Sequence, residues 1–155
     1  MFALCQRYIQ DPYEAEDVMM AGFLHMFSRL EQFTGEGQFE GWVRRIMVTQ
    51  ALQFLRKSKS MELVRLGEDA ENVVVGSGEI PASADHEMLL ALVQKLPMGY
   101  RMVFNLFAIE GYNHQEISEM LQISEGASKS QLHKARALLQ TWVSNLNKVQ
   151  TSNQN

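Results

Sequence analysis

The chain has 155 residues, of which 46% are hydrophobic, and its formal net charge at pH 7 is −4. This length suits one domain or two small helical ones, and the hydrophobic content excludes disorder along the whole chain. The single cysteine, Cys5, excludes an intrachain disulfide framework and a zinc cluster built from repeated Cys-x-x-Cys motifs.

The N-terminal segment does not resemble a signal peptide, because Arg7 and several acidic residues stand where a long apolar run would be required. No stretch reaches the roughly 18 apolar residues of a membrane span. We therefore expect a protein without membrane insertion that resides in the reducing cytoplasm.

The first part of the chain predicts two amphipathic helices, from Glu14 to Phe33 and from about Glu40 to Leu55. In both, apolar residues recur at spacings of three and four, which places them on one helix face. Gly35 and Gly37 separate the two helices. The predicted core positions are Val18, Met19, Phe23, Met26, Phe27 and Leu30, and then Trp42, Val43, Ile46, Met47, Leu52 and Leu55.

A segment with acidic residues, glycine and serine follows, and its lack of a sustained period predicts a linker over residues 60–84. Helical periodicity resumes at Asp85 and continues to Leu96. A further helix is predicted from about Met98 to Glu110.

Two capped helices are predicted next. Asn113 followed three residues later by Glu116 has the form of a capping box, and this helix should end near Leu121. Ser124 is the expected cap of the last helix, which should extend to about Leu146. The tail at residues 148–155 is expected to be frayed.

Positive charge is concentrated in two blocks that the net charge hides. Residues 41–59 contain five basic residues and no acid, and residues 126–155 contain four basic residues and no acid. Blocks of this kind favour contacts with nucleic acid phosphates. They are also compatible with solvated helix faces that happen to lack acids.

The two helices around residues 122–124 have the spacing of a helix-turn-helix. In that motif the start of the second helix enters the major groove, where lysine and glutamine side chains reach base edges. An ordinary helical hairpin is the alternative. We expect Ile117, Leu121, Ile123, Leu132 and Ala135 to pack between the helices, and Ser128, Lys129, Gln131 and Lys134 to face outward.

No residue pattern indicates catalysis, a metal or a cofactor. The four histidines, His25, His86, His114 and His133, do not have metal-ligand spacing. His114 with Glu116 lacks the Pro-Cys-x-x-Cys partner of a zinc deaminase. We expect no enzymatic activity, and we expect Cys5 to be a small buried hydrophobic residue.

Two stretches resemble sigma factors of the sigma-70 family. Residues 95–139 contain Leu-Pro, Glu-Gly-Tyr, Ile-Ser-Glu-Gly and Lys-Ser before Ala-Arg, a pattern that resembles sigma domain 4, and residues 7–57 resemble sigma domain 2. Their order, without the domain 3 of larger members, resembles the extracytoplasmic-function group. The resemblance implies an all-α fold with sigma domain 2 at 1–59, a linker at 60–84, sigma domain 4 at 85–147 and a tail at 148–155.

The resemblance also implies a function, which is to bind core RNA polymerase and to recognise the −10 and −35 elements of promoter DNA, with an anti-sigma factor as a possible further partner. In domain 2 it assigns core polymerase binding to Asp17, Met20, Ala21 and Leu24. It assigns the −10 element to Phe39, Arg44, Arg45, Thr49, Gln53, Arg56 and Lys57, and places capture of a flipped base at the loop 35–41.

In domain 4 the resemblance assigns the −35 element to the helix-turn-helix. Ala127 stands where the family usually has threonine, and His133 where it often has arginine. The implied contact residues are Gln115, Ser124, Gly126, Ala127, Ser128, Lys129, Gln131, Lys134 and Arg136.

A different class of function also fits the sequence. A free-standing helix-turn-helix regulator would bind DNA as a dimer on symmetric half-sites, with residues 1–57 serving as a dimerisation or sensing domain. A monomer that associates with core polymerase would favour the sigma factor.

Overall fold

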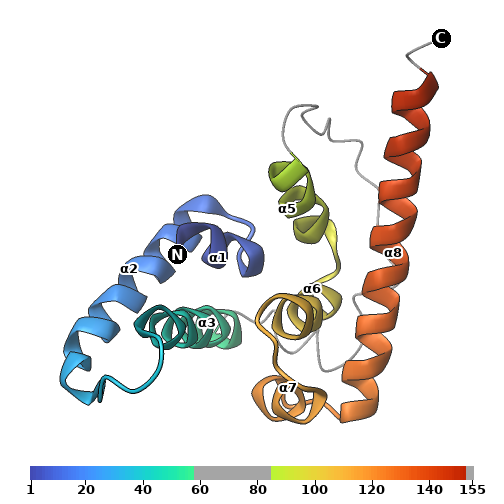
Figure 1. The fold of residues 1–155 in the computed structure, drawn as a ribbon. Coiled ribbons are helices and arrows are strands. Elements are labelled where there is room, and N and C mark those ends of the chain that lie inside the picture. The colour runs from blue at the N-terminus through green and yellow to red at the C-terminus, as the bar shows by residue number, and fades with distance from the viewer. Residues whose placement is uncertain (58–84, 153–155) are drawn as a thin grey trace. The chain divides into compact units, whose positions relative to one another are not determined.

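The computed structural model describes residues 1–57 and 85–152, and the elements in these ranges are all helices, as the sequence predicts. The chain divides into two compact units, Met1–Glu62 and Leu63–Asn155 (Figure 1). The linker predicted at 60–84 lies outside the described residues.

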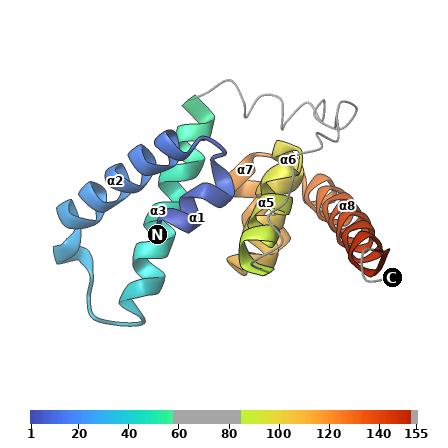
Figure 2. The ribbon, with the colours of Figure 1, turned by 90° about the horizontal axis from the view of Figure 1, so that it is seen from above.

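Unit 1 contains α1 (Phe2–Tyr8), α2 (Pro12–Ser28), the short 3₁₀ helix η1 (Leu30–Gln32) and α3 (Phe39–Lys57). Helix α2 packs along α3, and α1 contacts both of them (Figure 2). The sequence did not predict α1. It also predicted that α2 starts later, at Glu14, whereas the carboxylate of Asp11 caps the helix by accepting from the backbone N–H groups of Tyr13 and Glu14.

The core of unit 1 contains half of the twelve predicted apolar positions. Val18, Met26, Val43 and Met47 are buried, whereas the predicted core residues Phe27 and Leu30 are exposed. Leu30 lies beyond α2, in η1, which has no buried residue. The buried apolar side chains are Leu4, Cys5, Tyr8, Ile9, Ala15, Val18, Met26, Val43, Met47, Val48, Ala51, Leu52 and Leu55.

Unit 2 contains α5 (Asp85–Lys95), α6 (Met98–Phe104), a π-helix η3 (Asn105–Ile109), α7 (His114–Leu121) and α8 (Glu125–Ser152). The α-helix predicted to run to Glu110 therefore ends at Phe104 and continues as a π-helix. Gly111, with φ of 82°, then reverses the chain.

Helix α8 is the scaffold of unit 2, since it packs against α5, α6 and α7 (Figure 1). It continues to Ser152, past the end predicted near Leu146. The buried apolar side chains are Leu92, Val93, Leu96, Met102, Val103, Leu106, Ile117, Leu121, Leu132 and Ala135.

Arg101 is buried in this core, where its Nη1 group donates to the backbone carbonyl of Gln94 at 2.9 Å. A charged donor at the end of α5 satisfies a carbonyl that the helix leaves open. Across both described ranges, no helix has the length and apolar character that a bilayer crossing requires.

Candidate nucleic-acid interface

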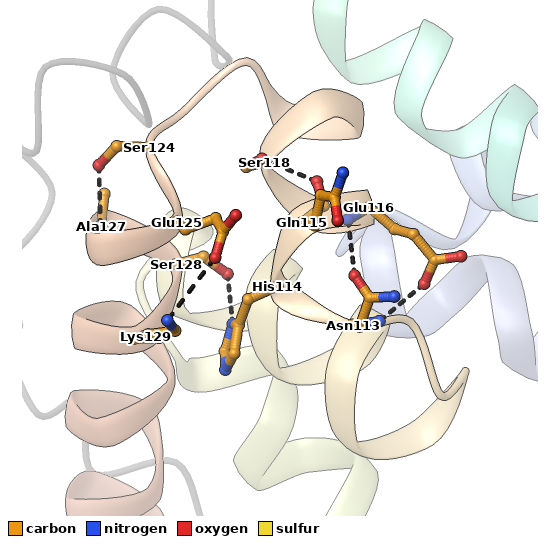
Figure 3. Close-up of polar contacts among 10 residues, drawn as sticks. All are labelled: Asn113, His114, Gln115, Glu116, Ser118, Ser124, Glu125, Ala127, Ser128 and Lys129. Atoms are coloured by element: carbon orange, nitrogen blue, oxygen red, sulfur yellow. Dashed lines mark hydrogen bonds and ion pairs between the residues drawn. The ribbon is translucent and has the colours of Figure 1, made fainter.

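The segment from α7 to α8 has the local geometry that the sequence predicts (Figure 3). The Asn113 side chain accepts from the backbone N–H of Glu116, and the Glu116 carboxylate accepts from the backbone N–H of Asn113 at 2.8 Å, which completes the capping box. Gln122 follows α7 with φ of 57° and ψ of 44°, the left-handed conformation of a helix C-terminus. The hydroxyl of Ser124 accepts from the backbone N–H of Ala127 at 3.0 Å, so it caps α8.

The residues expected between the two helices are in place. Ile117, Leu121, Leu132 and Ala135 are buried, and Ile123 is half-buried. The predicted helix-turn-helix packing is therefore confirmed. Three residues assigned to the −35 element are exposed to solvent, namely Gln115, Ser124 and Gly126.

Lys129, Lys134 and Arg136 of α8 are exposed, and each lies near another side chain. The Nζ atom of Lys129 lies 3.6 Å from the carboxylate of Glu125, an exposed ion pair that contributes little to stability. The Nζ atom of Lys134 lies 6.0 Å from the centre of the Tyr100 ring. Cation–π contacts of this kind limit the directions a side chain samples while leaving its charge accessible.

Two residues predicted to face outward do not. Ser128 is completely buried, and its hydroxyl lies 2.9 Å from Nδ1 of His114. Gln131 is half-buried and packs over Gly99 of α6, where an added Cβ would lie 3.1 Å from its Oε1 atom. Ser128 lies four residues before Leu132 and seven before Ala135, which places it on the inner stripe of the helix.

Three of the residues assigned to the −10 element lie on one exposed face of α3. Arg45, Thr49 and Gln53 follow each other at spacings of four and are exposed, with Arg56 and Lys57 at the end of the helix. Arg44, by contrast, is half-buried. The hydroxyl of Thr49 donates to the carbonyl of Arg45 at 2.8 Å.

Three aromatic rings form a cluster at the start of α3. The ring centres of Phe33 and Phe39 are 5.2 Å apart, and Trp42 lies 5.4 Å from Phe33. Trp42 is half-buried in this cluster and does not belong to the buried core, which differs from the prediction. A hollow beside the cluster is lined by Gln32, Phe33, Thr34, Glu36, Gly37, Gln38, Gly41, Trp42 and Arg45.

An exposed apolar face runs along α2. The four residues assigned to polymerase binding, Asp17, Met20, Ala21 and Leu24, are all exposed, and Leu24 has 68% of its surface accessible. Sequence reasoning missed that Tyr13 and Phe27 extend this face, at spacings of three and four from its other members. The exposed hydrophobic residues of α2 thus recur at helical spacing on one side of the helix.

The single cysteine, Cys5, belongs to the core of unit 1. Cys5 is buried, and this burial raises the pKa of its thiol. In residues 1–57 and 85–152, no three side chains of the metal-ligating types come together.

Two families match the chain. Sigma-70 region 2 matches residues 1–61, and Sigma-70, region 4 matches residues 86–139. Among curated proteins, the chain is 26% identical over 148 residues to the ECF RNA polymerase sigma factor SigE of Mycolicibacterium smegmatis, covering 92% of this chain and 57% of that protein. It is 27% identical over 150 residues to the ECF RNA polymerase sigma factor SigW of Bacillus subtilis, covering 90% of this chain and 80% of that protein. The chain belongs to the extracytoplasmic-function group of the sigma-70 family.

In this sigma factor, region 2 covers α1, α2 and α3, and region 4 covers α5, α6, α7 and the part of α8 up to Leu139. The fold agrees with that of the sigma factor RpoE from Bartonella quintana, which was crystallised with the anti-sigma factor NepR. That structure has a TM-score of 0.58 and 18% sequence identity, and the match covers 92% of this chain and 89% of RpoE. The chain spans little more than half the length of SigE.

Proposed function

We propose that this sigma factor brings core RNA polymerase to promoters in the cytoplasm, with unit 1 binding the enzyme and the −10 element and unit 2 binding the −35 element. The observation that carries the proposal is an exposed basic helix face in each of two sigma-70 regions of one chain, on α3 and on α8. The family comprises transcription initiation factors, so we propose no catalytic residue, metal or cofactor.

The exposed face of α2 is the proposed surface for core polymerase. Met20 and Leu24 supply apolar area that water otherwise covers, and Asp17 adds a negative charge for a basic partner. Tyr13 and Phe27 extend this surface toward both ends of the helix.

The exposed face of α3 and the adjacent aromatic hollow are the proposed −10 site. Arg45, Arg56 and Lys57 would follow phosphates of the separated strand, which is an electrostatic and sequence-independent task. Phe39 and Trp42 offer ring faces on which an unstacked base can lie.

The start of α8 is the proposed −35 site. Lys129, Lys134 and Arg136 are exposed along the first half of this helix, and Gly126 in its first turn is exposed. Exposed helix N-termini bind phosphates through their N–H groups. The proposal leaves Ser128 out of the contact set because it is buried.

A protein that masks these surfaces would switch the sigma factor off. The related RpoE structure contains an anti-sigma factor. We therefore include an anti-sigma factor among the proposed partners, with the apolar face of α2 as the surface for which it would compete with polymerase.

The test is transcription by core RNA polymerase on genomic DNA of the source organism, with and without the purified chain, followed by sequencing of RNA 5′ ends. The expected result is a set of start sites that depend on the protein and share two upstream elements. If an unrelated sigma factor activates the same core but this chain yields no new start sites, the proposal is wrong.

The matches to two sigma-70 regions do not favour the free-standing dimeric regulator. Light scattering during size-exclusion chromatography separates the two possibilities directly. A monomer that elutes with core polymerase supports the sigma factor, whereas a dimer that protects a palindrome supports the regulator.

A further inference from the structure

A partly buried hydrogen bond joins the two helices of the helix-turn-helix. Nδ1 of His114, the first residue of α7, lies 2.9 Å from the hydroxyl of Ser128, in the first turns of α8 (Figure 3). Ser128 is completely buried and His114 is half-buried. A buried side-chain hydrogen bond requires a narrow range of distances and angles, so it restricts how the two helices are rotated against each other.

Phe107 links the same two helices from a third element. It lies in the π-helix η3, and its ring stacks on His114 with centres 4.6 Å apart and an interplanar angle of 21°. The guanidinium carbon of Arg136, in α8, lies 5.6 Å from the centre of the same ring. A π-helix is rare, shifts the helical register and is frequent at functional sites. Here it places one aromatic ring against both α7 and a basic residue of α8.

We infer that His114 is a positioning residue for −35 recognition, which through Ser128 and Phe107 fixes the rotation of α8 about its own axis. One residue of helix corresponds to about 100° of rotation, so even a fraction of that step would move Lys129 and Lys134 away from their targets. This inference rests on the proposed function, because it assumes that α8 reads the −35 element.

The chemistry of the contact suits a fixed link. A serine hydroxyl both donates and accepts, and it rotates to suit its partner. The hydrogen bond therefore forms with either neutral tautomer of His114 and with the charged imidazolium. Its role is to hold geometry, and Ser128 itself is too buried to touch DNA.

Two substitutions remove the bond with little other change. Ser128→Ala deletes only the hydroxyl and leaves a residue that favours helix. His114→Phe keeps a ring to stack on Phe107 and deletes the nitrogen. Ser144→Ala, at an exposed position of α8 far from the motif, is the matched control.

The experiment uses holoenzyme assembled from core polymerase and the full chain. The probes are a duplex that wild-type holoenzyme has enriched from a library randomised across the −35 region, and a scrambled duplex of equal length. We expect both variants to bind the enriched duplex about fivefold more weakly, the loss that one ordinary hydrogen bond predicts. Binding to the scrambled duplex should not change, because non-specific binding is not tied to one position on the duplex and α8 can meet phosphates at many positions along it.

The double variant completes the test. Because both single substitutions delete the same bond, His114→Phe with Ser128→Ala should bind no more weakly than either alone. If the variants lose the same affinity for both duplexes, the role of His114 is merely structural and the inference is wrong. Additive losses of affinity in the double variant, or wild-type affinity in the single variants, would also overturn it. Should His114→Phe fail to fold, Ser128→Ala decides alone. Failure of the wild-type chain to activate core polymerase would refute the proposed function instead.

Discussion

Gly22 lies in α2 where this helix packs on Met47 of α3. A Cβ atom at Gly22 would overlap the Met47 sulfur, whereas one at Gly41 of α3 meets nothing within 4 Å. Alanine in a helix is more favourable than glycine by about 1 kcal/mol, but overpacking costs about 1–3 kcal/mol. We expect Gly41→Ala to raise the free energy of unfolding and Gly22→Ala to lower it. Urea denaturation followed by circular dichroism measures both, and equal stability of the two variants would contradict the close packing.

Cys5 gives unit 1 a pH dependence at alkaline pH. Burial raises the pKa of its thiol above the ordinary value of 9.0, so the folded state holds this proton more tightly than the unfolded state. The stabilisation is complete below the unfolded pKa and is lost as pH rises through the raised pKa. Cys5→Ala should therefore lose less stability than wild type as the pH rises above 9.0. Parallel urea curves check this, and identical pH slopes would rule it out.

Ser128 shows which part of a site residue can be read from sequence. The spacing of Ser128, Leu132 and Ala135 indicates that Ser128 lies on the buried side of the helix. The prediction nevertheless placed it on the surface, because serine is polar. The buried hydroxyl of Ser128 has a hydrogen-bond partner, His114, which lies fourteen residues away in a different helix. Periodicity reports helix faces, whereas a hydrogen-bond partner across a turn depends on tertiary packing.

The apolar face of α2 is an element-scale feature with a direct test. Leu24→Glu should weaken binding to core polymerase tenfold or more, since about 1.4 kcal/mol is a modest loss for a buried interface residue. Because Leu24 is 68% exposed, the stability of the free chain should change by less than about 0.5 kcal/mol. Fluorescence titration with labelled core measures the affinity. Ala3→Glu, exposed on α1, is the control, and equal affinities for both variants would place the polymerase surface elsewhere.

The basic side of α8 makes a prediction about salt. If Lys134 contacts a phosphate, Lys134→Ala should reduce the slope of log affinity against log salt concentration by about one. The loss should be similar for related −35 sequences, because a phosphate contact carries no base information. Lys95→Ala, exposed on α5, serves as control. DNA titrations at several salt concentrations measure this slope. An unchanged slope would show that Lys134 does not contact a phosphate.

At the scale of elements, long periodic helices could be predicted and short or irregular ones could not. The bodies of α2, α3 and α7 follow from apolar spacing and caps. Helix α1 has only seven residues, too few for a period to stand out, and it is helical because it packs on α2 and α3. The π-helix η3 has no local signature, since its hydrogen bonding differs from an α-helix by one residue.

At the scale of the whole chain, a net charge of −4 conceals two basic helix faces in two compact units. The acidic excess lies elsewhere in the sequence, so overall charge was a poor guide to nucleic acid binding. The order of the two sigma-70 regions could be predicted from sequence motifs. Which side chains of each basic helix are exposed could be determined only from the folded structure of each unit.

Covalent connection of the two units is the last feature with a testable consequence. When one unit holds the polymerase and promoter, the other binds its own element at an effective concentration in the millimolar range, far above that of a free protein. A protease site inserted within residues 60–84 allows the same preparation to be assayed intact and cleaved. We expect cleavage to reduce transcription from a promoter with both elements at least about tenfold at submicromolar protein, although each unit stays folded by circular dichroism. The control is the wild-type chain treated with the same protease, which should keep its activity. Full activity after cleavage would mean that the two units act without needing to be parts of one molecule.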